Sequence, residues 1–421
     1  MKFIHLKQIW EQFRSNRFFG FLSLFGMSIP VMVIMIMVLK IDLSIHPGGP
    51  ERNNDQMLFL NQMKITRADG SYAWGGLPVG MIEKHFARMA PQNRLAFSAS
   101  ETTTMFRETN ALDLSLRYTN AGFWQVFDFE FLQGHPYTRG NVKDQDNVAV
   151  ISRSLKERLF NQSEVAGKTL KLDGHTFRVI GVVQKVNSLA RNTYAQVWLP
   201  YTWRRHSTTT PYYNRTGAYG LTFRSSGGWG FPDIRRQVRD LKRKVNHLND
   251  EGTRVLFAGP AQAAEIYFRA YRDPQAYKGV IMSYIGVAGK ALIILLLPAL
   301  NLVSINLTRI QERSQEIAIR KAFGATRKSL TYRIMGENAV LTLAGGFLGL
   351  VLAYLAAFLF KDQIFTAYFV ADAQQAMIQM NYGVFFILIL VSLIFSILSG
   401  WIPAMRISRL NPAYVLKGGA L

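Results

Sequence analysis

The sequence predicts an α-helical membrane protein with four transmembrane helices and one large α+β domain outside the membrane. Two observations lead to this fold class. Hydrophobic residues make up 49% of the 421 residues, but they gather into four long runs instead of being spread evenly. The roughly 240 residues between the first two runs alternate short apolar strands with amphipathic helices, which is typical of a folded domain and not of a loop.

Each of the four runs is long enough to cross a membrane, because the hydrocarbon core is about 30 Å thick and takes about 20 helical residues. Lys290 is the single charge in the second run and Glu337 the single charge in the third. The alternative for any one run is a buried core helix. The first run is too long for a signal peptide and no small-residue cleavage site follows it, so we expect an uncleaved anchor. The predicted spans are residues 18–39, 280–307, 334–360 and 383–405.

The short segments beside the spans differ in charge, and this difference predicts the orientation. Lysine and arginine are concentrated in the N-terminal segment 1–17, the loop 308–333 and the tail 406–421. We therefore expect these three parts, and so both termini, in the cytoplasm. The core domain 40–279 and the short loop 361–382 are then on the outer side of the membrane. The net charge of the chain is +22, and part of it comes from a basic helix in the outer domain. Basic helices can bind nucleic acid, but this one is expected outside the cytoplasm, so no nucleic-acid partner is expected.

In the outer domain, two strand–helix–strand (βαβ) units are predicted to flank a β-rich insert at about 101–203. Within the insert, Asp173-Gly174 lies between two alternating strands and predicts a hairpin turn, and Ser152 is placed to cap a short helix. The expected strands are 57–65, 94–100, 147–151, 220–223 and 254–258, the hairpin is 168–183, and the helices are 77–89, 152–160 and 231–248.

The sequence contains no pattern typical of catalysis or cofactor binding. It has no cysteine, which excludes disulfides, thiol catalysis and cysteine-based metal sites, and its seven histidines are isolated from one another. The Gly-Lys-Thr at 167–169 is not a phosphate-binding loop, because Gln162 stands where that motif needs glycine and a hairpin follows instead of a helix. We expect no catalytic residue, no metal site, no cofactor on this chain and no enzymatic activity of its own.

The loop 308–333 contains a charged stretch, ERSQEIAIRKAFGATRKSL, with helical spacing. Glu316 and Arg320 form an i,i+4 pair, Gly324 suits the position that ends a helix, and Thr326 suits the cap of the next one. The helix is too short and too charged to span the bilayer, so it is expected at the membrane surface. It is either an interfacial helix that fixes the topology or a surface on which a cytoplasmic partner acts.

The whole order of segments resembles the MacB/LolC/FtsX family of ABC transporter permeases: one span, a large outer domain, three spans and the tail RISRLNPAYVLKGG. The stretch SQEIAIRKAFGATRKSL, followed by GENAVLTLAGGFLGLVLAYL, is similar to the C-terminal membrane domain of that family. The stretch VAVISRSLKERLF, followed by AGKTLKLDGHTFRVIGVV, is similar to its periplasmic core domain. The resemblance covers nearly the whole chain. It implies a location in the inner membrane of a bacterium, with the core domain 40–279 and the loop 361–382 in the periplasm.

This resemblance implies a function. In that family the helix at this position is a coupling helix, which docks on a separate cytoplasmic ATPase that holds the ATP and magnesium. Closure of the ATPase dimer moves the spans, and the outer domain moves with them, so that cargo is expelled or extracted from the periplasm or outer leaflet without crossing the spans. The ATPase-coupling positions implied for this chain are Glu312, Arg313, Glu316, Ile317, Arg320, Phe323 and Gly324.

The same resemblance implies several partners, and two alternative functions stand beside the favoured one. The partners are the ATPase, a second permease protomer that is either identical or different, the lipid bilayer, and a periplasmic or outer-membrane protein. One alternative function is an FtsX-like regulator that switches cell-wall hydrolases with the same mechanism. The other is a membrane scaffold that works without an ATPase.

Five positions within the predicted spans stand out. Glu337 is either a functional carboxylate inside the membrane or a group at its interface. Lys290 either reaches the outer interface with its long side chain or acts in a proton relay. Gly345, Gly346 and Gly349 form a face of small residues, which suits close packing against another span or a second protomer.

Overall fold

The chain folds into two compact units, which are described separately below. Unit 1 comprises Met1–Ile41, Ile285–Ile364 and Ile378–Leu421, and unit 2 comprises Asp42–Tyr284 and Phe365–Met377. The computed structural model describes residues 17–89, 94–107, 110–160, 164–204, 215–225, 230–248, 252–268 and 326–360, together with single helical residues and short helical pieces at 285–294, 319–323 and 383–390.

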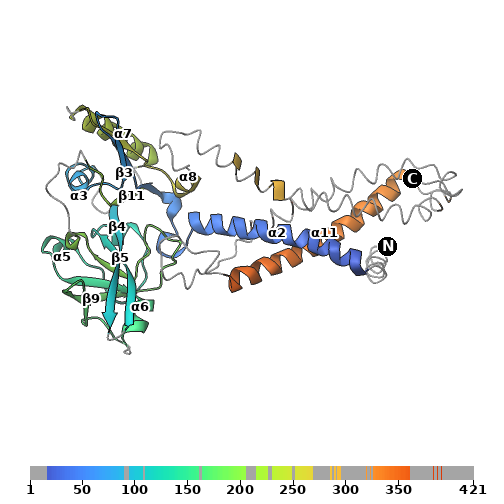
Figure 1. Ribbon diagram of the computed structural model, residues 1–421, viewed down its shortest axis with the longest axis horizontal. Helices are drawn as coiled ribbons and strands as arrows, with labels where there is room; N and C mark the ends of the chain where they lie inside the picture. Colours follow the sequence, from blue (N-terminus) through green and yellow to red (C-terminus); the bar gives the residue numbers. More distant parts are fainter. Residues whose placement is uncertain are drawn as a thin grey trace. The chain divides into compact units, whose positions relative to one another are not determined.

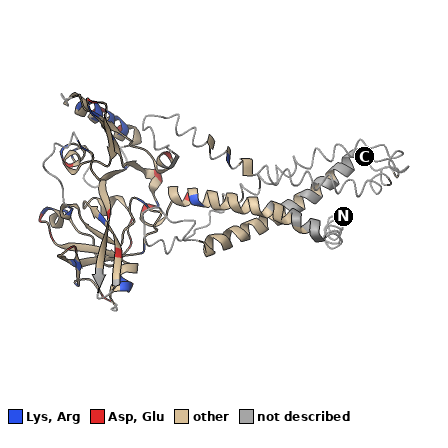
Figure 2. Cartoon of the chain, viewed as in Figure 1, with Lys and Arg blue, Asp and Glu red and all other residues tan. Residues whose placement is uncertain are grey.

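Two long helices dominate the described part of unit 1 (Figure 1). Helix α2 runs over Arg17–Ile45, past the predicted end of the first span at Leu39, and α11 runs without a break over Arg327–Leu359. In α2 the segment Leu24–Ile45 has 22 residues and a mean hydropathy of 2.3, which is long and apolar enough to cross a membrane. In α11 the apolar segment is shorter, Leu343–Leu359. Figure 2 shows few charged residues on the described parts of these helices.

The predicted count of four spans remains a prediction. The first and third predicted spans correspond to α2 and α11. The second and fourth, at 280–307 and 383–405, lie almost entirely outside the described residues, where Lys290 is among the few positions described.

Unit 2 is built on two β-sheets with short helices around them (Figure 1). The larger sheet has nine strands in the order β1-β11-β4-β5-β10-β7-β9-β6, with β8 paired to β9. Its members are β1 (Met57–Leu60), β4 (Leu95–Arg107), β5 (Asn110–Thr119), β6 (Phe131–Gly134), β7 (Val148–Ser152), β8 (Thr169–Leu172), β9 (His175–Val183), β10 (Val197–Pro200) and β11 (Gly220–Arg224). The smaller sheet has the order β12-β2-β3, formed by β2 (Met63–Thr66), β3 (Tyr72–Gly75) and β12 (Arg254–Phe257).

The helices of unit 2 are short except for α7. They are α3 (Val79–Met81), continued by the π-helical turn η3 (Ile82–Phe86), α4 (Phe123–Val126), α5 (Arg139–Lys143), α6 (Arg153–Leu159), α7 (Phe231–His247) and α8 (Ala263–Phe268). Three 3₁₀ turns complete the described elements: η1 (Gly49–Glu51), η2 (Asn54–Gln56) and η4 (Tyr201–Trp203). The mixed sheets and helices confirm the predicted α+β class for this domain.

The two predicted βαβ units are interleaved and not separate. Strand β1 pairs antiparallel with β11, and β11 pairs antiparallel with β4, so β1 and β4 run parallel with β11 between them. The helical turns α3 and η3 connect β3 to β4, and α7 connects β11 of the larger sheet to β12 of the smaller sheet. Strands β1 and β4, with β11 between them, form a split βαβ motif, and β12 pairs with β2 of the first unit.

The structure differs from the sequence prediction in two places. The segment 57–65 is not one strand, because β1 and β2 separate at Asn61 and enter different sheets. The break follows from strand pairing, since β1 pairs with β11 whereas β2 pairs with β12 and β3. All four residues of β1 are buried, and those of β2 alternate between buried and half-buried. The boundary of the expected insert near residue 101 falls in the middle of β4, so the insert continues the same nine-stranded sheet.

The large sheet separates two hydrophobic clusters. Alternate residues of one strand enter different clusters: Val197 and Leu199 of β10 lie in the first and Trp198 in the second. This alternation is expected for a sheet that is covered on both faces, because successive side chains point to opposite sides. The first cluster includes Ile234 and Val238 of α7, and the second includes residues of α4.

Two local predictions are confirmed in this sheet. Ser152 caps α6, where its hydroxyl accepts a hydrogen bond of 3.2 Å from the backbone N–H of Leu155. Asp173 and Gly174 form the turn between β8 and β9 with φ values of 48° and 81°. Positive φ at both central residues is the signature of a type I′ hairpin turn.

Candidate functional site

Most of the predicted ATPase-coupling residues lie outside the described residues. These are Glu312, Arg313, Glu316, Ile317, Arg320 and Gly324. Phe323 is described, and its side chain is 88% exposed. Its backbone N–H donates a hydrogen bond of 3.0 Å to the carbonyl oxygen of Ile319, which is the i→i−4 bond of an α-helix.

The structure describes the singled-out residues of the predicted spans in different detail. Lys290 is in helical conformation with an exposed side chain. Glu337 lies within α11, but its side chain is outside the description. The glycines Gly345, Gly346 and Gly349 all lie buried in α11.

Gly349 lies at the contact between α11 and α2. A Cβ atom at this position would be 2.7 Å from the carbonyl oxygen of Ser28 and 2.9 Å from Cβ of Val31. The backbones can approach this closely only because glycine has no side chain. Ala353 and Ala357 continue the same four-residue spacing along α11 and are also buried.

The outer sides of both helices are apolar. Exposed positions recur about every four residues, which places them on one side of each helix. They are Phe21, Phe25, Ile29 and Val33 in α2 and Leu343, Phe347, Val351 and Phe358 in α11. Large exposed apolar faces are expected on helices that contact lipid.

A second arrangement lies where α2 leads into the sheets of unit 2. The segment Pro47–Gln56, called the joint segment below, contains η1 and η2 and connects the end of α2 to β1. The last turn of α2, from Asp42, belongs to the same compact unit as the sheets. Asn54 donates a hydrogen bond of 3.0 Å from its side chain to the carbonyl oxygen of Ile45, and Asn187 donates one of 3.3 Å to that of Pro47.

Glu51 holds the middle of the joint segment. Its carboxylate is buried and accepts hydrogen bonds from the backbone N–H of Asn192 at 3.0 Å and from the hydroxyl of Thr193 at 2.9 Å. The side chains of Asn192 and Asn54 donate to its other oxygen. Burial raises the pKa of Glu51, while these hydrogen bonds and the charge of Arg117 oppose the rise.

Arg117 connects the same loop to β5. It is buried and donates hydrogen bonds to the carbonyl oxygens of Tyr194 at 3.0 Å and Arg191 at 2.8 Å, and to the hydroxyl of Ser98 at 3.0 Å. Burial lowers the pKa of Arg117 to about 10, partly offset by Glu51, so the guanidinium remains charged at neutral pH. Glu51 and Arg117 thus fix the joint segment, the loop 187–196 and β5 to one another.

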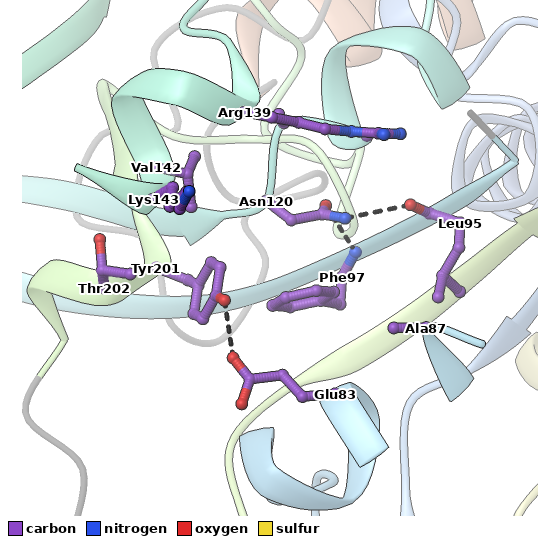
Figure 3. A pocket seen from close by; sticks show the side chains of 12 residues that line it. Glu83, Ala87, Leu95, Phe97, Asn120, Arg139, Val142, Lys143, Tyr201 and Thr202 are labelled. Carbon is purple, nitrogen blue, oxygen red and sulfur yellow. Dashed lines mark hydrogen bonds between the residues drawn. The ribbon is translucent and has the colours of Figure 1, made fainter. Parts of the chain in front are cut away.

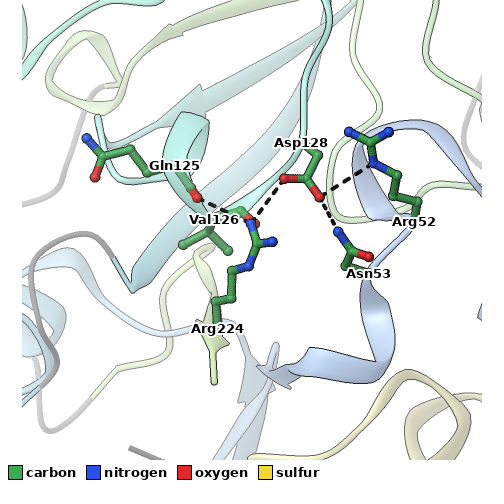
Figure 4. Close-up of polar contacts among 6 residues, drawn as sticks. All are labelled: Arg52, Asn53, Gln125, Val126, Asp128 and Arg224. Carbon is green, nitrogen blue, oxygen red and sulfur yellow. Dashed lines mark hydrogen bonds and ion pairs between the residues drawn. The ribbon is translucent and has the colours of Figure 1, made fainter. Parts of the chain in front are cut away.

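Asp128 holds the joint segment from a second direction (Figure 4). One carboxylate oxygen accepts a hydrogen bond of 2.5 Å from the side chain of Asn53 and lies 3.6 Å from Nε of Arg52. The other lies 3.1 Å from Nη1 of Arg224 at the end of β11, which also donates to the carbonyl oxygen of Val126 at 3.0 Å. The joint segment is therefore bound to β11 and to the segment after α4.

No pattern in the sequence predicts the roles of Glu51, Arg117 and Asp128. The only signal was local: the stretch PGGPERNND is rich in turn-forming residues and contains three charged residues, but it resembles an ordinary linker. Among the described residues, no group of three His, Asp or Glu side chains is placed to hold a metal ion.

Comparison with known proteins supports the same organisation. The family model for the MacB-like periplasmic core domain matches residues 21–241, and that for the FtsX-like permease C-terminal region matches residues 290–412. The uncharacterized ABC transporter permease YknZ of Bacillus subtilis is 23% identical over 322 residues, covering 76% of this chain and 74% of YknZ.

A longer relative and one solved structure are also similar to part of this chain. The macrolide export ATP-binding/permease protein MacB of Pasteurella multocida is 23% identical over 318 residues, and the match covers 73% of this chain but only 45% of that protein. The crystal structure of the periplasmic region of MacB from Actinobacillus actinomycetemcomitans matches 49% of this chain and 91% of its own, with 18% identity and a TM-score of 0.34. The core-domain match spans more than half of the chain, and we conclude that it belongs to the MacB-like and FtsX-like family of ABC transporter permeases, as the sequence resemblance predicted.

Proposed function

We propose that this chain is the membrane subunit of an ABC transporter that transmits motion from a separate cytoplasmic ATPase to its periplasmic domain, driving efflux or extraction of cargo. It works as a dimer of permease chains, with ATP and magnesium on the ATPase. Both termini and the loop 308–333 face the cytoplasm, and the chain crosses the inner membrane four times. The observation that supports transmission is the fixed joint segment between α2 and the sheets.

Motion of α2 can reach the sheets only if the segment that connects them is stiff. A flexible linker of ten residues would allow its ends to move by about 15–20 Å relative to each other, since its end-to-end distance scales as about 5–6 Å times the square root of its length. The joint segment instead contains two 3₁₀ turns and is bonded through Glu51, Asn53 and Asn54. Hydrogen bonds to charged groups contribute about 1.5–3 kcal/mol each, so several must break before the segment becomes flexible.

The test compares the native joint with a loosened one. Two glycines inserted between His46 and Pro47 would lengthen the connection without removing any bond made by Glu51 or Asp128. A spin label on Lys168→Cys, an exposed position in unit 2, would report the distance between the two protomers with and without ATP. The chain has no other cysteine, so the label is unique.

We expect the distance to change with nucleotide in the native chain and to change much less in the insertion variant, while the bound ATPase still hydrolyses ATP. A matched control carries the two glycines between Asp69 and Gly70, in an exposed turn remote from the joint segment. Equal nucleotide-dependent changes in all three proteins, or an unchanged distance in a native complex that still moves its cargo, would exclude transmission through the joint.

A further inference from the structure

A cavity of ≈ 460 Å³ opens in unit 2 beside the start of β4 (Figure 3). Its wall on one side is η3 with Glu83, and on the other side it is α5 with Arg139 and Lys143. Phe97 and Tyr201 lie between them. This volume is within the range of about 300–1,000 Å³ that is typical of sites for small molecules.

The floor of the cavity is held in place by its own contacts. Asn120 accepts a hydrogen bond of 3.1 Å from the backbone N–H of Phe97 and donates one of 3.1 Å to the carbonyl oxygen of Leu95. The rings of Phe97 and Tyr201 meet edge to face with centroids 4.8 Å apart. A site formed in advance by such contacts loses little conformational freedom when a ligand binds.

The cavity is lined by two cationic side chains, Arg139 and Lys143, and one anionic side chain, Glu83. The carboxylate of Glu83 accepts a hydrogen bond of 2.7 Å from the hydroxyl of Tyr201. Burial raises the pKa of Tyr201, and Glu83 raises it further, so the hydroxyl stays a neutral donor. Arg139 and Lys143 are exposed, and neither side chain forms a hydrogen bond or ion pair with another described residue.

Helix α5 holds these two cations on one side of the cavity. Arg139 and Lys143 are four residues apart, so their side chains leave the same face of the helix. The helix begins with a capping box, in which Asn141 accepts a hydrogen bond of 2.8 Å from the backbone N–H of Thr138 and the Thr138 hydroxyl accepts one from the N–H of Asn141. The two cations and one engaged carboxylate leave an excess of positive charge beside an aromatic floor.

We propose that this cavity binds a small amphiphile with an apolar or aromatic body and one anionic group. The body lies on Phe97 and Tyr201, and the anionic group lies at Arg139 and Lys143. The site stands apart from the transmission mechanism, because binding needs neither the ATPase nor movement of the spans. A failure of one proposal therefore leaves the other unaffected.

The test uses the full chain in phosphatidylcholine nanodiscs and the photoreactive probe para-benzoylbenzoate. Its uncharged analogue para-benzoylbenzamide has the same aromatic body. Mass spectrometry locates the peptides that become labelled, and the dependence of labelling on probe concentration gives the affinity. We expect saturable labelling of the segments around Phe97 and Tyr201 by the carboxylate, and weaker binding of the amide on the order of tenfold, because charge-assisted hydrogen bonds are lost.

Three variants separate the contributions. The double variant Arg139→Gln with Lys143→Gln is expected to weaken binding of the carboxylate on the order of tenfold, whereas the charge-matched control Lys168→Gln with Lys171→Gln leaves it unchanged. Ala87→Trp places a large side chain in the cavity and is expected to lower labelling by both probes. Glu83→Gln removes a repulsive charge and is expected to strengthen binding of the carboxylate.

Several results would overturn the proposal. Equal labelling by the carboxylate and the amide would exclude a role for the charge. Equal losses in the Arg139/Lys143 variant and its control, or weaker carboxylate binding in Glu83→Gln, would do the same. Labelling that is not saturable, or that Ala87→Trp leaves unchanged, would show that the cavity is not the site. If doping the nanodiscs with phosphatidylglycerol competes with the probe, the native ligand is carried by a lipid, and without competition it is a soluble amphiphile.

Discussion

Gly349 of α11 lies so close to Ser28 of α2 that a Cβ atom on the glycine would be 2.7 Å from the serine carbonyl oxygen. At Gly346, one turn earlier in the same helix, an added Cβ atom would have no atom of another described element within 4 Å. Two glycines one turn apart in the same helix therefore differ in what an added methyl group would contact. Comparing them distinguishes the effect of helix packing from that of helix propensity.

We predict opposite effects for Gly349→Ala and Gly346→Ala. Both substitutions favour the helix by up to about 1 kcal/mol, because alanine has a higher helix propensity than glycine. At Gly349 the added methyl also overpacks the contact with α2, which costs about 1–3 kcal/mol. Thermal unfolding in nanodiscs is expected at a lower temperature for Gly349→Ala and at an equal or higher temperature for Gly346→Ala. Identical shifts would mean that α2 and α11 do not pack in this way in lipid.

The orientation predicts which sites an impermeant maleimide can reach. In intact spheroplasts we expect labelling of Lys168→Cys, in the periplasmic domain, and none of Ser314→Cys, in the loop 308–333, until the membrane is permeabilised. The absence of native cysteine leaves each label with a single target. Labelling of Ser314→Cys alone in intact spheroplasts would reverse the orientation derived from the lysine and arginine distribution.

If the loop 308–333 contains a coupling helix, a charge reversal on it should weaken binding of the ATPase. Glu316→Lys reverses a charge on the proposed docking face, so we expect less ATPase to copurify with the variant, while its amount in the membrane is unchanged. Lys361→Glu, a charge reversal in the loop 361–382, is the control and is expected to retain the partner. Full ATPase retention by Glu316→Lys, together with native stimulation of hydrolysis, would argue for an interfacial helix that only fixes the topology.

Local signals in the sequence were enough for part of this fold. The cap at Ser152 and the turn at Asp173-Gly174 depend on residues close in sequence, and both are present in the structure. The separation of β1 from β2 at Asn61 depends on pairing with different distant strands, which no local pattern shows. The joint is hidden for the same reason, since Glu51 and its partner Asn192 are 141 positions apart. A buried carboxylate and a linker glutamate look alike in a sequence.

The Asp128 cluster predicts a moderate loss of stability in unit 2. Asp128→Asn keeps the shape of the side chain but removes the charge that attracts Arg224 and Arg52. These groups are partly exposed to solvent, which weakens their attraction, so we expect a loss of about 1–2 kcal/mol. Asp240→Asn is the matched control, because Asp240 forms an exposed pair with Arg243 at 3.7 Å and is expected to contribute little. Urea unfolding followed by tryptophan fluorescence measures the stability of both variants. Equal unfolding midpoints for Asp128→Asn and Asp240→Asn would show that Asp128 does not stabilise the joint segment.

Glu51 offers a test of the joint that depends on pH. Trp198 is a suitable reporter, because its indole N–H donates a hydrogen bond of 3.1 Å to the carbonyl oxygen of Thr193, whose hydroxyl binds Glu51. Burial raises the pKa of Glu51 above its ordinary value of 4.5 in the folded protein. In the unfolded chain the same carboxyl is solvated and titrates near that ordinary value. The folded protein therefore binds this proton at a higher pH than the unfolded chain does.

This difference fixes the sign of the pH dependence. As the pH falls from neutral through the folded pKa, the folded state gains the proton first, so native Glu51 adds stability until the unfolded chain is also protonated near pH 4.5. The glutamine in Glu51→Gln cannot titrate, whereas all other groups titrate as in the native chain. Subtracting the stability of this variant therefore leaves the contribution of Glu51 alone. We expect the free energy of unfolding of the native chain, minus that of the variant, to rise between neutral pH and 4.5 and to stay constant below it. A difference that falls on acidification would mean that attraction to Arg117 and the four hydrogen bonds outweigh burial, and that the joint is strongest with Glu51 charged.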